Sequence, residues 1–124
     1  MKRILVVDDS PLARQVVRGV SVALVPNAVI VEAEDGAVAL RHLNGSSFDL
    51  VVCDLNMPVM DGHAMLARMR ALAMHKRTPV IVLSSLVNPS NTAQLRAAGA
   101  TVVLKKPFSN QQIRDAFKTV GLAA

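Results

Sequence analysis

Acidic residues follow two apolar segments of this chain at the point where each segment ends. Asp8 and Asp9 come directly after residues 4–7, and Asp54 comes directly after residues 50–53. If the two segments are neighbouring parallel strands, their carboxyl ends meet at one edge of a sheet, where ligands bind in open α/β proteins. Carboxylates that converge repel one another, and Mg²⁺ is a hard cation that accepts such oxygen ligands. The spacing therefore predicts a magnesium site.

A hydroxyl and an ammonium group follow two further apolar segments. Ser84 follows residues 80–83, and Lys106 follows the segment 101–104, just before Pro107. A lysine and Mg²⁺ can share the negative charge of a phosphoryl group, to which a hydroxyl can donate a hydrogen bond. A carboxylate can itself act as the nucleophile and form an acyl phosphate. The set of residues indicates an aspartate that accepts a phosphoryl group beside a magnesium site.

The segments that must position these residues alternate between two kinds. Short β-branched runs are typical of strands that are covered on both faces, and they occupy residues 4–7, 50–53, 80–83 and 101–104. A fifth run, residues 29–33, carries Glu32 and is expected at a sheet edge. Helical spacing or capping signals lie between the runs, over residues 11–24, 35–45, 62–72, 91–99 and 109–121. The alternation predicts an α/β domain with a parallel sheet in (βα)5 order.

Four stretches of the chain together resemble the receiver domain of bacterial two-component response regulators, particularly the single-domain chemotaxis (CheY-like) type. They are ILVVDDS at residue 4, DLNMPVMDG at residue 54, PVIVLSS at residue 79 and KPF at residue 106. The order and spacing match the family, so one receiver domain over residues 1–124 is expected. The resemblance implies a flavodoxin-like three-layer sandwich whose five-stranded parallel sheet has the order 2-1-3-4-5.

The resemblance also implies a role for each residue of the set. Asp54 would be the phosphoacceptor and would receive a phosphoryl group from a phosphohistidine of a histidine kinase or a phosphotransfer protein. Hydrolysis of the acyl phosphate would end the signal. Ser84 and Lys106 would contact the phosphoryl oxygens, and the Lys106–Pro107 peptide would be cis. The implied Mg²⁺ ligands are the side chains of Asp9 and Asp54, the backbone carbonyl of Asn56 and, mostly through water, Asp8. The chain would be no enzyme beyond its own phosphorylation and dephosphorylation.

One position departs from the family pattern. The family usually has Tyr or Phe where this chain has Val103, and that ring takes part in transmitting the signal. The resemblance places output on the surface of the fourth helix, fifth strand and fifth helix, possible targets including a chemotaxis motor. Four basic residues mark this surface: Arg96, Lys105, Arg114 and Lys118. A constitutive adaptor with a weakened switch is therefore an alternative function.

Two further alternatives come from other classes of protein. An aspartate-nucleophile phosphatase of related fold would carry Asp-x-Asp after its first strand and would need a cap over its pocket. This chain has adjacent Asp8 and Asp9 and no insertion that could form a cap. A flavin-mononucleotide protein is disfavoured because the same carboxylates would repel a phosphate. Turnover of a small phosphate ester would identify the phosphatase.

Composition excludes several classes of partner. The net charge is +5, yet the basic residues are scattered, and with no Trp or Tyr there is no aromatic platform for nucleic-acid bases. No apolar run approaches the roughly 18 residues of a membrane span. The single cysteine, Cys53, excludes an internal disulfide and is expected in the core, which suits a cytoplasmic domain. The histidines lack metal-ligand spacing and are expected at exposed or partly buried positions; they are His42, His63 and His75.

Overall fold

The computed structural model describes residues 1–57 and 59–123, so Pro58 of the second motif and Ala124 lie outside the described residues. Its sheet is parallel and has the order β2-β1-β3-β4-β5, as the resemblance implied. The strands are β1 (Arg3–Val7), β2 (Val29–Ala33), β3 (Leu50–Asp54), β4 (Val80–Ser84) and β5 (Val102–Lys105). The strand that carries Glu32 is indeed at an edge of the sheet.

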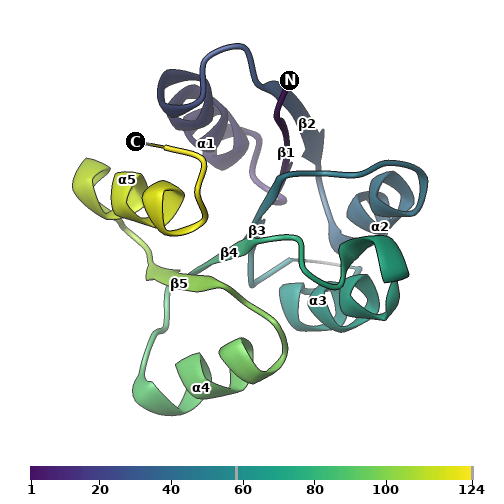
Figure 1. Ribbon diagram of the computed structural model, residues 1–124. Helices are drawn as coiled ribbons and strands as arrows, with labels where there is room; N and C mark the ends of the chain where they lie inside the picture. The colour runs from purple at the N-terminus through teal and green to yellow at the C-terminus, as the bar shows by residue number, and fades with distance from the viewer. Residues whose placement is uncertain (58, 124) are drawn as a thin grey trace.

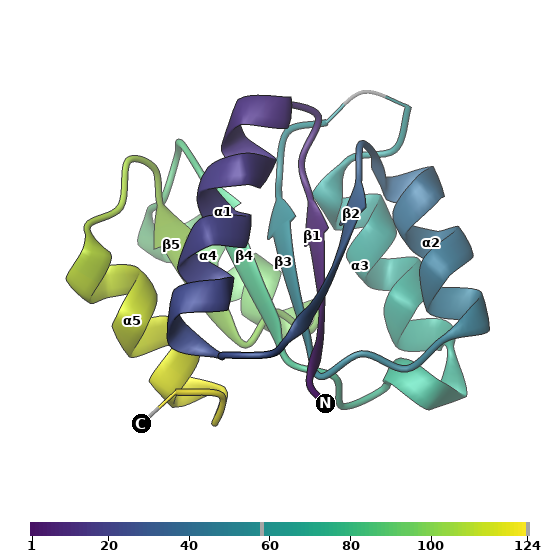
Figure 2. The same ribbon diagram turned by 90° about the horizontal axis from the view of Figure 1, so that it is seen from above.

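The helices form two layers on either side of the sheet. They are α1 (Pro11–Leu24), α2 (Gly36–Gly45), α3 (Gly62–Ala71), α4 (Pro89–Ala97) and α5 (Asn110–Thr119), with a short 3₁₀ turn η1 (Ala73–His75) after α3. In Figure 1, α1 and α5 cover one face of the sheet, and α2, α3 and α4 cover the other. Figure 2 shows the strands side by side, with the N-terminus and the end of α5 at the end of the sheet opposite to the carboxyl ends of the strands. The fold is the flavodoxin-like three-layer sandwich that the resemblance implied.

The core consists of two apolar clusters separated by the sheet. Alternate residues of each strand face opposite sides, so Leu5 packs toward α2 and α3, whereas Ile4 packs toward α1 and α5. Every residue of β3 and β4 is buried, as expected of strands covered on both faces. Phe117 of α5 is also fully buried. The two layers hold the central strands rigidly, and the carboxyl ends of those strands carry the acidic residues.

Side-chain caps fix where the helices begin. The caps whose side chains accept a hydrogen bond from a backbone N–H of the first helical turn are Ser10, Asp35, Asp61, Asn88 and Ser109. The predicted start of the fourth helix at residue 91 was late. The helix begins at Pro89, because Asn88 and Asn91 cap each other's backbone N–H groups and proline suits the first helical position.

The predicted strand ends differ from the structure by one residue, and the difference bears on the site. Asp54 and Ser84 are the last residues of β3 and β4 rather than the first residues beyond them. Their backbones are therefore held by the sheet ladder, Asp54 opposite Leu83.

No helix among residues 1–57 and 59–123 is long and apolar enough to cross a membrane.

Candidate functional site

Three carboxylates converge at the carboxyl ends of β1 and β3. One oxygen from each of Asp8, Asp9 and Asp54 lies within 4.8 Å of the others. The convergence follows from the sheet, because Val7 pairs with Cys53 and the next residues of the two strands lie side by side. Asp8 and Asp54 are buried whereas Asp9 is exposed. The predicted cluster is therefore present and opens to solvent on one side.

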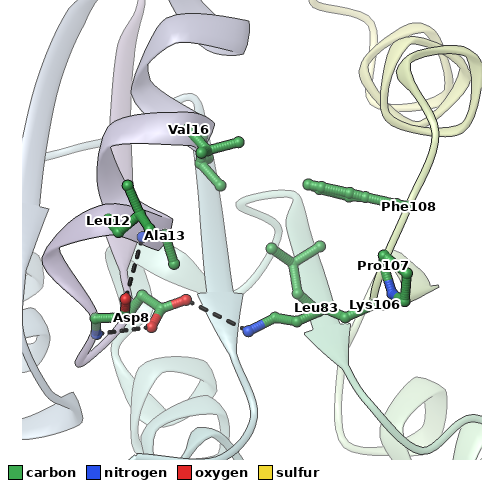
Figure 3. A pocket seen from close by; sticks show the side chains of 10 residues that line it. Asp8, Leu12, Ala13, Val16, Leu83, Lys106, Pro107 and Phe108 are labelled. Carbon is green, nitrogen blue, oxygen red and sulfur yellow. Dashed lines mark hydrogen bonds and ion pairs between the residues drawn. The ribbon is translucent and has the colours of Figure 1, made fainter.

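Lys106 lies against two of these carboxylates. Its Nζ is 2.8 Å from Asp54 Oδ1 and 3.5 Å from Asp8 Oδ2, and Figure 3 shows the ammonium pointing toward Asp8. Burial alone would lower the pKa of Lys106, but the close contact with Asp54 and the negative charges of Asp54 and Asp8 outweigh it and raise that pKa. The peptide between Lys106 and Pro107 is cis, as expected. The ammonium is thus firmly protonated beside Asp54.

Asp8 has one satisfied and one unsatisfied oxygen. Its Oδ1 accepts a hydrogen bond from the Ser10 N–H at 3.0 Å, whereas the buried Oδ2 accepts none from any described residue. Burial, reinforced by the charge of Asp54, raises the pKa of Asp8 against the opposing effects of the Ser10 N–H and Lys106. Among the described residues, this buried oxygen has only the Lys106 ammonium, at 3.5 Å, as an ion-pair partner. A buried carboxylate oxygen without a hydrogen bond, in a cluster of three carboxylates, fits a hard divalent cation such as Mg²⁺.

Ser84 is at the same sheet edge, but its hydroxyl is engaged elsewhere. Ser84 Oγ donates to the Leu86 carbonyl at 2.9 Å and accepts from the Leu86 N–H at 3.2 Å. Asn91 Nδ2 donates to the same carbonyl at 2.7 Å. The Ser84 carbonyl in turn accepts the N–H of Lys106 at 2.8 Å, which ties the ends of β4 and β5 together. The hydroxyl is therefore joined to the loop that leads into α4.

Asn56 lies in the loop after β3 and is exposed. This loop is held against the rest of the fold at Met60, whose carbonyl accepts the Gly36 N–H at 3.2 Å. A Cβ at Gly36 would stand 2.7 Å from that carbonyl oxygen, so only glycine allows this approach. The loop with Asn56 is thus anchored to the start of α2.

An apolar groove adjoins the carboxylate cluster. It has a volume of about 520 Å³ and lies between α1 and the segment after β5. Leu12 is 70% exposed and Val16 is 52% exposed, which is unusual for side chains of this kind. Figure 3 shows Val16 and Phe108 on opposite sides of the groove, with Asp8 and Lys106 at one end.

Sequence reasoning missed the burial of His75. The expected exposed or partly buried position was wrong for this residue, since it is fully buried. Its Nε2 lies 2.8 Å from the Leu43 carbonyl and its Nδ1 lies 3.0 Å from Thr78 Oγ1. The imidazole thereby satisfies a carbonyl near the end of α2, where carbonyls lack partners within the helix. His42 is half-buried and His63 is exposed, as expected.

Sequence reasoning also missed Arg14. Its Nη1 donates to the backbone carbonyl of Asp8 at 2.6 Å, and its Nε donates to Glu32 Oε1 at 3.1 Å. The available signal was its position four residues after the Ser10 cap, which is one helical turn into α1. That spacing alone does not distinguish an exposed arginine from one that contacts the acidic loop, residues 8–10 after β1.

Comparison with known proteins gives one consistent result. The family model described as "Response regulator receiver domain" matches residues 4–118. A gliding motility regulatory protein of Myxococcus xanthus is 38% identical over 84% of this chain, which spans 13% of the length of that relative.

Solved structures agree with the family match. The chemotaxis protein CheY4 of Vibrio cholerae has a TM-score of 0.88 and 32% identity, with coverage of 97% of this chain and 98% of that one. The response regulator TrrA of Thermotoga maritima, in complex with Mg²⁺-BeF, has a TM-score of 0.81 and 28% identity, with coverage of 97% and 99%. The match across the motifs, the sheet order and the acidic site shows that this chain belongs to the family of response regulator receiver domains of two-component signalling.

Proposed function

We propose that this chain is a phosphorylation switch in which Asp54 accepts a phosphoryl group in the presence of Mg²⁺. The observation that carries the proposal is the contact of 2.8 Å between the Lys106 ammonium and Asp54, beside the unsatisfied Oδ2 of Asp8. Receiver domains are in general not enzymes that act on a separate substrate. The family match therefore favours a switch over the phosphatase alternative.

The proposed cation ligands are those that the resemblance implied. Asp8, Asp9 and Asp54 would supply carboxylate oxygens, and the exposed loop residue Asn56 would supply its backbone carbonyl. When bound, Mg²⁺ supplies positive charge against the phosphoryl oxygens and lowers the repulsion among the carboxylates. The structure of the similar TrrA in complex with Mg²⁺-BeF supports Mg²⁺ as the cation.

The transfer step needs little rearrangement at Asp54. Its carboxylate oxygen attacks phosphorus and a P–O bond forms, while the P–N bond to the donor histidine breaks and leaves its electron pair on nitrogen. A proton already on the other ring nitrogen of the donor makes the departing imidazole neutral. Lys106 is in place to neutralise the charge on the phosphoryl oxygens. Ser84 would donate to a phosphoryl oxygen after its hydroxyl turns away from the Leu86 carbonyl.

The surroundings of the site suit a protein as the phosphodonor. Leu12 and Val16 on α1 and Phe108 beyond β5 line the apolar groove that ends at Asp8 and Lys106. Exposed apolar patches next to a reactive group are typical of protein interaction sites. We therefore assign the donor to a histidine kinase or a phosphotransfer protein, and we place the switch in the cytoplasm with such donors.

The output surface is proposed to comprise α4, β5 and α5. Lys105 on β5 and Arg96 on α4 are exposed and give the surface a basic character, whereas Arg114, exposed on α5, lines a groove between α5 and α1. The similarity to a chemotaxis protein supports a role in chemotaxis or motility. Val103 is partly buried on β5 and cannot contribute the ring that the family usually has there. That residue favours the second candidate, a constitutive adaptor with a weakened switch.

Intact mass spectrometry after incubation with acetyl phosphate and Mg²⁺ tests the switch. We expect one phosphoryl adduct on the wild type and on Asp115→Asn, a matched change on the exposed face of α5, and none on Asp54→Ala. EDTA should abolish the adduct. An adduct that persists in Asp54→Ala would contradict the proposal. So would a wild type that forms no adduct with acetyl phosphate and none with a phosphorylated histidine kinase.

Partner affinity distinguishes the switch from the adaptor. A beryllofluoride adduct at Asp54 mimics the phosphoryl group without being hydrolysed. Proteins retained by the chain with and without beryllofluoride should differ if the switch is active. Identical binding constants for an identified partner in the two states would establish the adaptor.

A further inference from the structure

Arg14 joins the acidic loop to the edge of the sheet. Its guanidinium donates to the Asp8 carbonyl at 2.6 Å through Nη1 and to Glu32 Oε1 at 3.1 Å through Nε. The Arg14 side chain is only 17% exposed, although it lies on a surface helix. Its donors are therefore directed inward, at one carbonyl and one carboxylate.

The Asp8 carbonyl belongs to the peptide unit that leads to Asp9. The Asp8 N–H is held by the Ala33 carbonyl at 3.1 Å, and Asp8 Oδ1 is held by the Ser10 N–H. The ladder between β1 and β3 ends at Val7, so it does not hold the peptide beyond Asp8. Arg14 supplies the contact to the carbonyl. The direction of this peptide determines where the Asp9 side chain starts.

Glu32 fixes the guanidinium from the opposite side. Its second carboxylate oxygen accepts from Arg18 Nη1 at 3.1 Å, so two arginines one turn apart on α1 bind one carboxylate of β2. Only Arg14 also reaches the acidic loop. Because an arginine presents its donors in a rigid planar fork, the positions of Glu32 and the Asp8 carbonyl are linked through one group.

We propose that Arg14 is a positioning residue for Mg²⁺, which it serves by fixing the peptide between Asp8 and Asp9. The inference rests on the proposed function, since it requires that the carboxylates bind the cation. Arg14 does not contact the cation in this role. It acts through Asp8 and Asp9, as outer-shell partners of metal ligands generally do.

The effect of charge alone has the opposite sign. A guanidinium near a cation site repels the cation, so its removal would tighten Mg²⁺ binding if charge dominated. Loss of positioning weakens Mg²⁺ binding instead. Lysine at position 14 keeps the charge but replaces the planar fork with a single ammonium, which separates the two effects.

The test measures Mg²⁺ affinity by competition with a fluorescent Mg²⁺ indicator, because the chain has no Trp or Tyr to report binding. We expect a dissociation constant about 10-fold weaker for Arg14→Ala, an intermediate value for Arg14→Lys, and a change under about 2-fold for the matched control Arg18→Ala. Equal or tighter binding by Arg14→Ala, or equal weakening by Arg18→Ala, would overturn the proposal.

A second readout separates positioning from a general loss of structure. In acetyl phosphate reactions, Arg14→Ala should need about 10-fold more Mg²⁺ for half-maximal rate, while its rate at saturating Mg²⁺ stays within about 2-fold of wild type. If Arg14→Ala does not fold, Arg14→Lys carries the same comparison. A wild type that binds no Mg²⁺ overturns the proposed function itself, whereas unchanged Mg²⁺ dependence in both Arg14 variants overturns only the role of Arg14.

Discussion

Replacement of Asp8 by asparagine is expected to stabilise the metal-free protein. Asp8 is nearly fully buried, and its carboxylate lies within 4.8 Å of those of Asp9 and Asp54. Burial is the largest cause that disfavours this charge. At an effective dielectric constant of about 20, the repulsion from the buried Asp54 is about 3 kcal/mol or more, and water screens that from the exposed Asp9. The Lys106 ammonium at 3.5 Å contributes about 5 kcal/mol of attraction, which burial and repulsion together exceed.

In EDTA at pH 7, the free energy of unfolding of Asp8→Asn should therefore exceed that of wild type by about 1–2 kcal/mol. This figure allows for the weaker hydrogen bond that the Ser10 N–H donates to an asparagine side chain in place of the Asp8 carboxylate. Mg²⁺ should act in the opposite direction. At one hundred times its dissociation constant it stabilises wild type by about 2.7 kcal/mol, and it should stabilise Asp8→Asn far less. The order of stability of the two proteins should then reverse.

The pH dependence follows from the raised pKa of Asp8. A carboxyl group whose pKa is raised by folding stabilises the native state at low pH and loses that contribution as pH rises through its folded pKa. The advantage of Asp8→Asn should accordingly be absent below the ordinary aspartate pKa of 3.8 and should grow above it.

Urea unfolding followed by far-ultraviolet circular dichroism measures these differences. The matched control is Asp115→Asn on the exposed face of α5, which should change stability by less than about 0.5 kcal/mol with or without Mg²⁺. The reasoning is refuted if Asp8→Asn is less stable than wild type in EDTA at pH 7. Equal stabilisation of both proteins by Mg²⁺ would refute it as well.

Four further substitutions probe the site and its supports. Lys106→Ala should slow phosphorylation by acetyl phosphate about 100-fold, measured by intact mass, because Asp54 loses its cationic partner at 2.8 Å. Gly62→Ala should lower the free energy of unfolding by about 1–3 kcal/mol, since its Cβ would meet backbone atoms at 2.9 and 3.0 Å, whereas Gly19→Ala, with open space, should raise it by about 0.5–1 kcal/mol. His75→Ala should lower the urea midpoint by an amount that corresponds to about 2–4 kcal/mol, because buried polar partners lose their hydrogen bonds.

The strands could be predicted from the residues alone, because strands buried on both faces leave short runs of β-branched residues. The strand order, which puts the ends of β1 and β3 and therefore Asp8 and Asp54 side by side, came from the family resemblance. The start of α4 could also have been predicted, since Asn88 followed by Pro89 is a helix-start signal. The start was placed two residues late because the apolar periodicity of this helix is weak.

Contacts that depend on distant residues could not be predicted. His75 is buried because the Leu43 carbonyl, on a different helix, lies against it. The Arg14 side chain could equally have extended into solvent, and its contact with Asp8 depends on how α1 packs beside β2. The hydroxyl of Ser84 binds Leu86 because of the path of the loop, which a local pattern does not encode.

The contact between Lys106 and Asp8 joins the first and the last strand of the chain in sequence order. Contacts between such remote parts of a chain close late in folding, because a large loop must be restricted before they form. During synthesis, β1 and β3 leave the ribosome well before β5, so a growing chain carries its acidic residues without the ammonium that accompanies them in the finished domain. If Asp54 is the phosphoacceptor, as we propose, competence to receive a phosphoryl group then arrives only once the segment after β5 has been made.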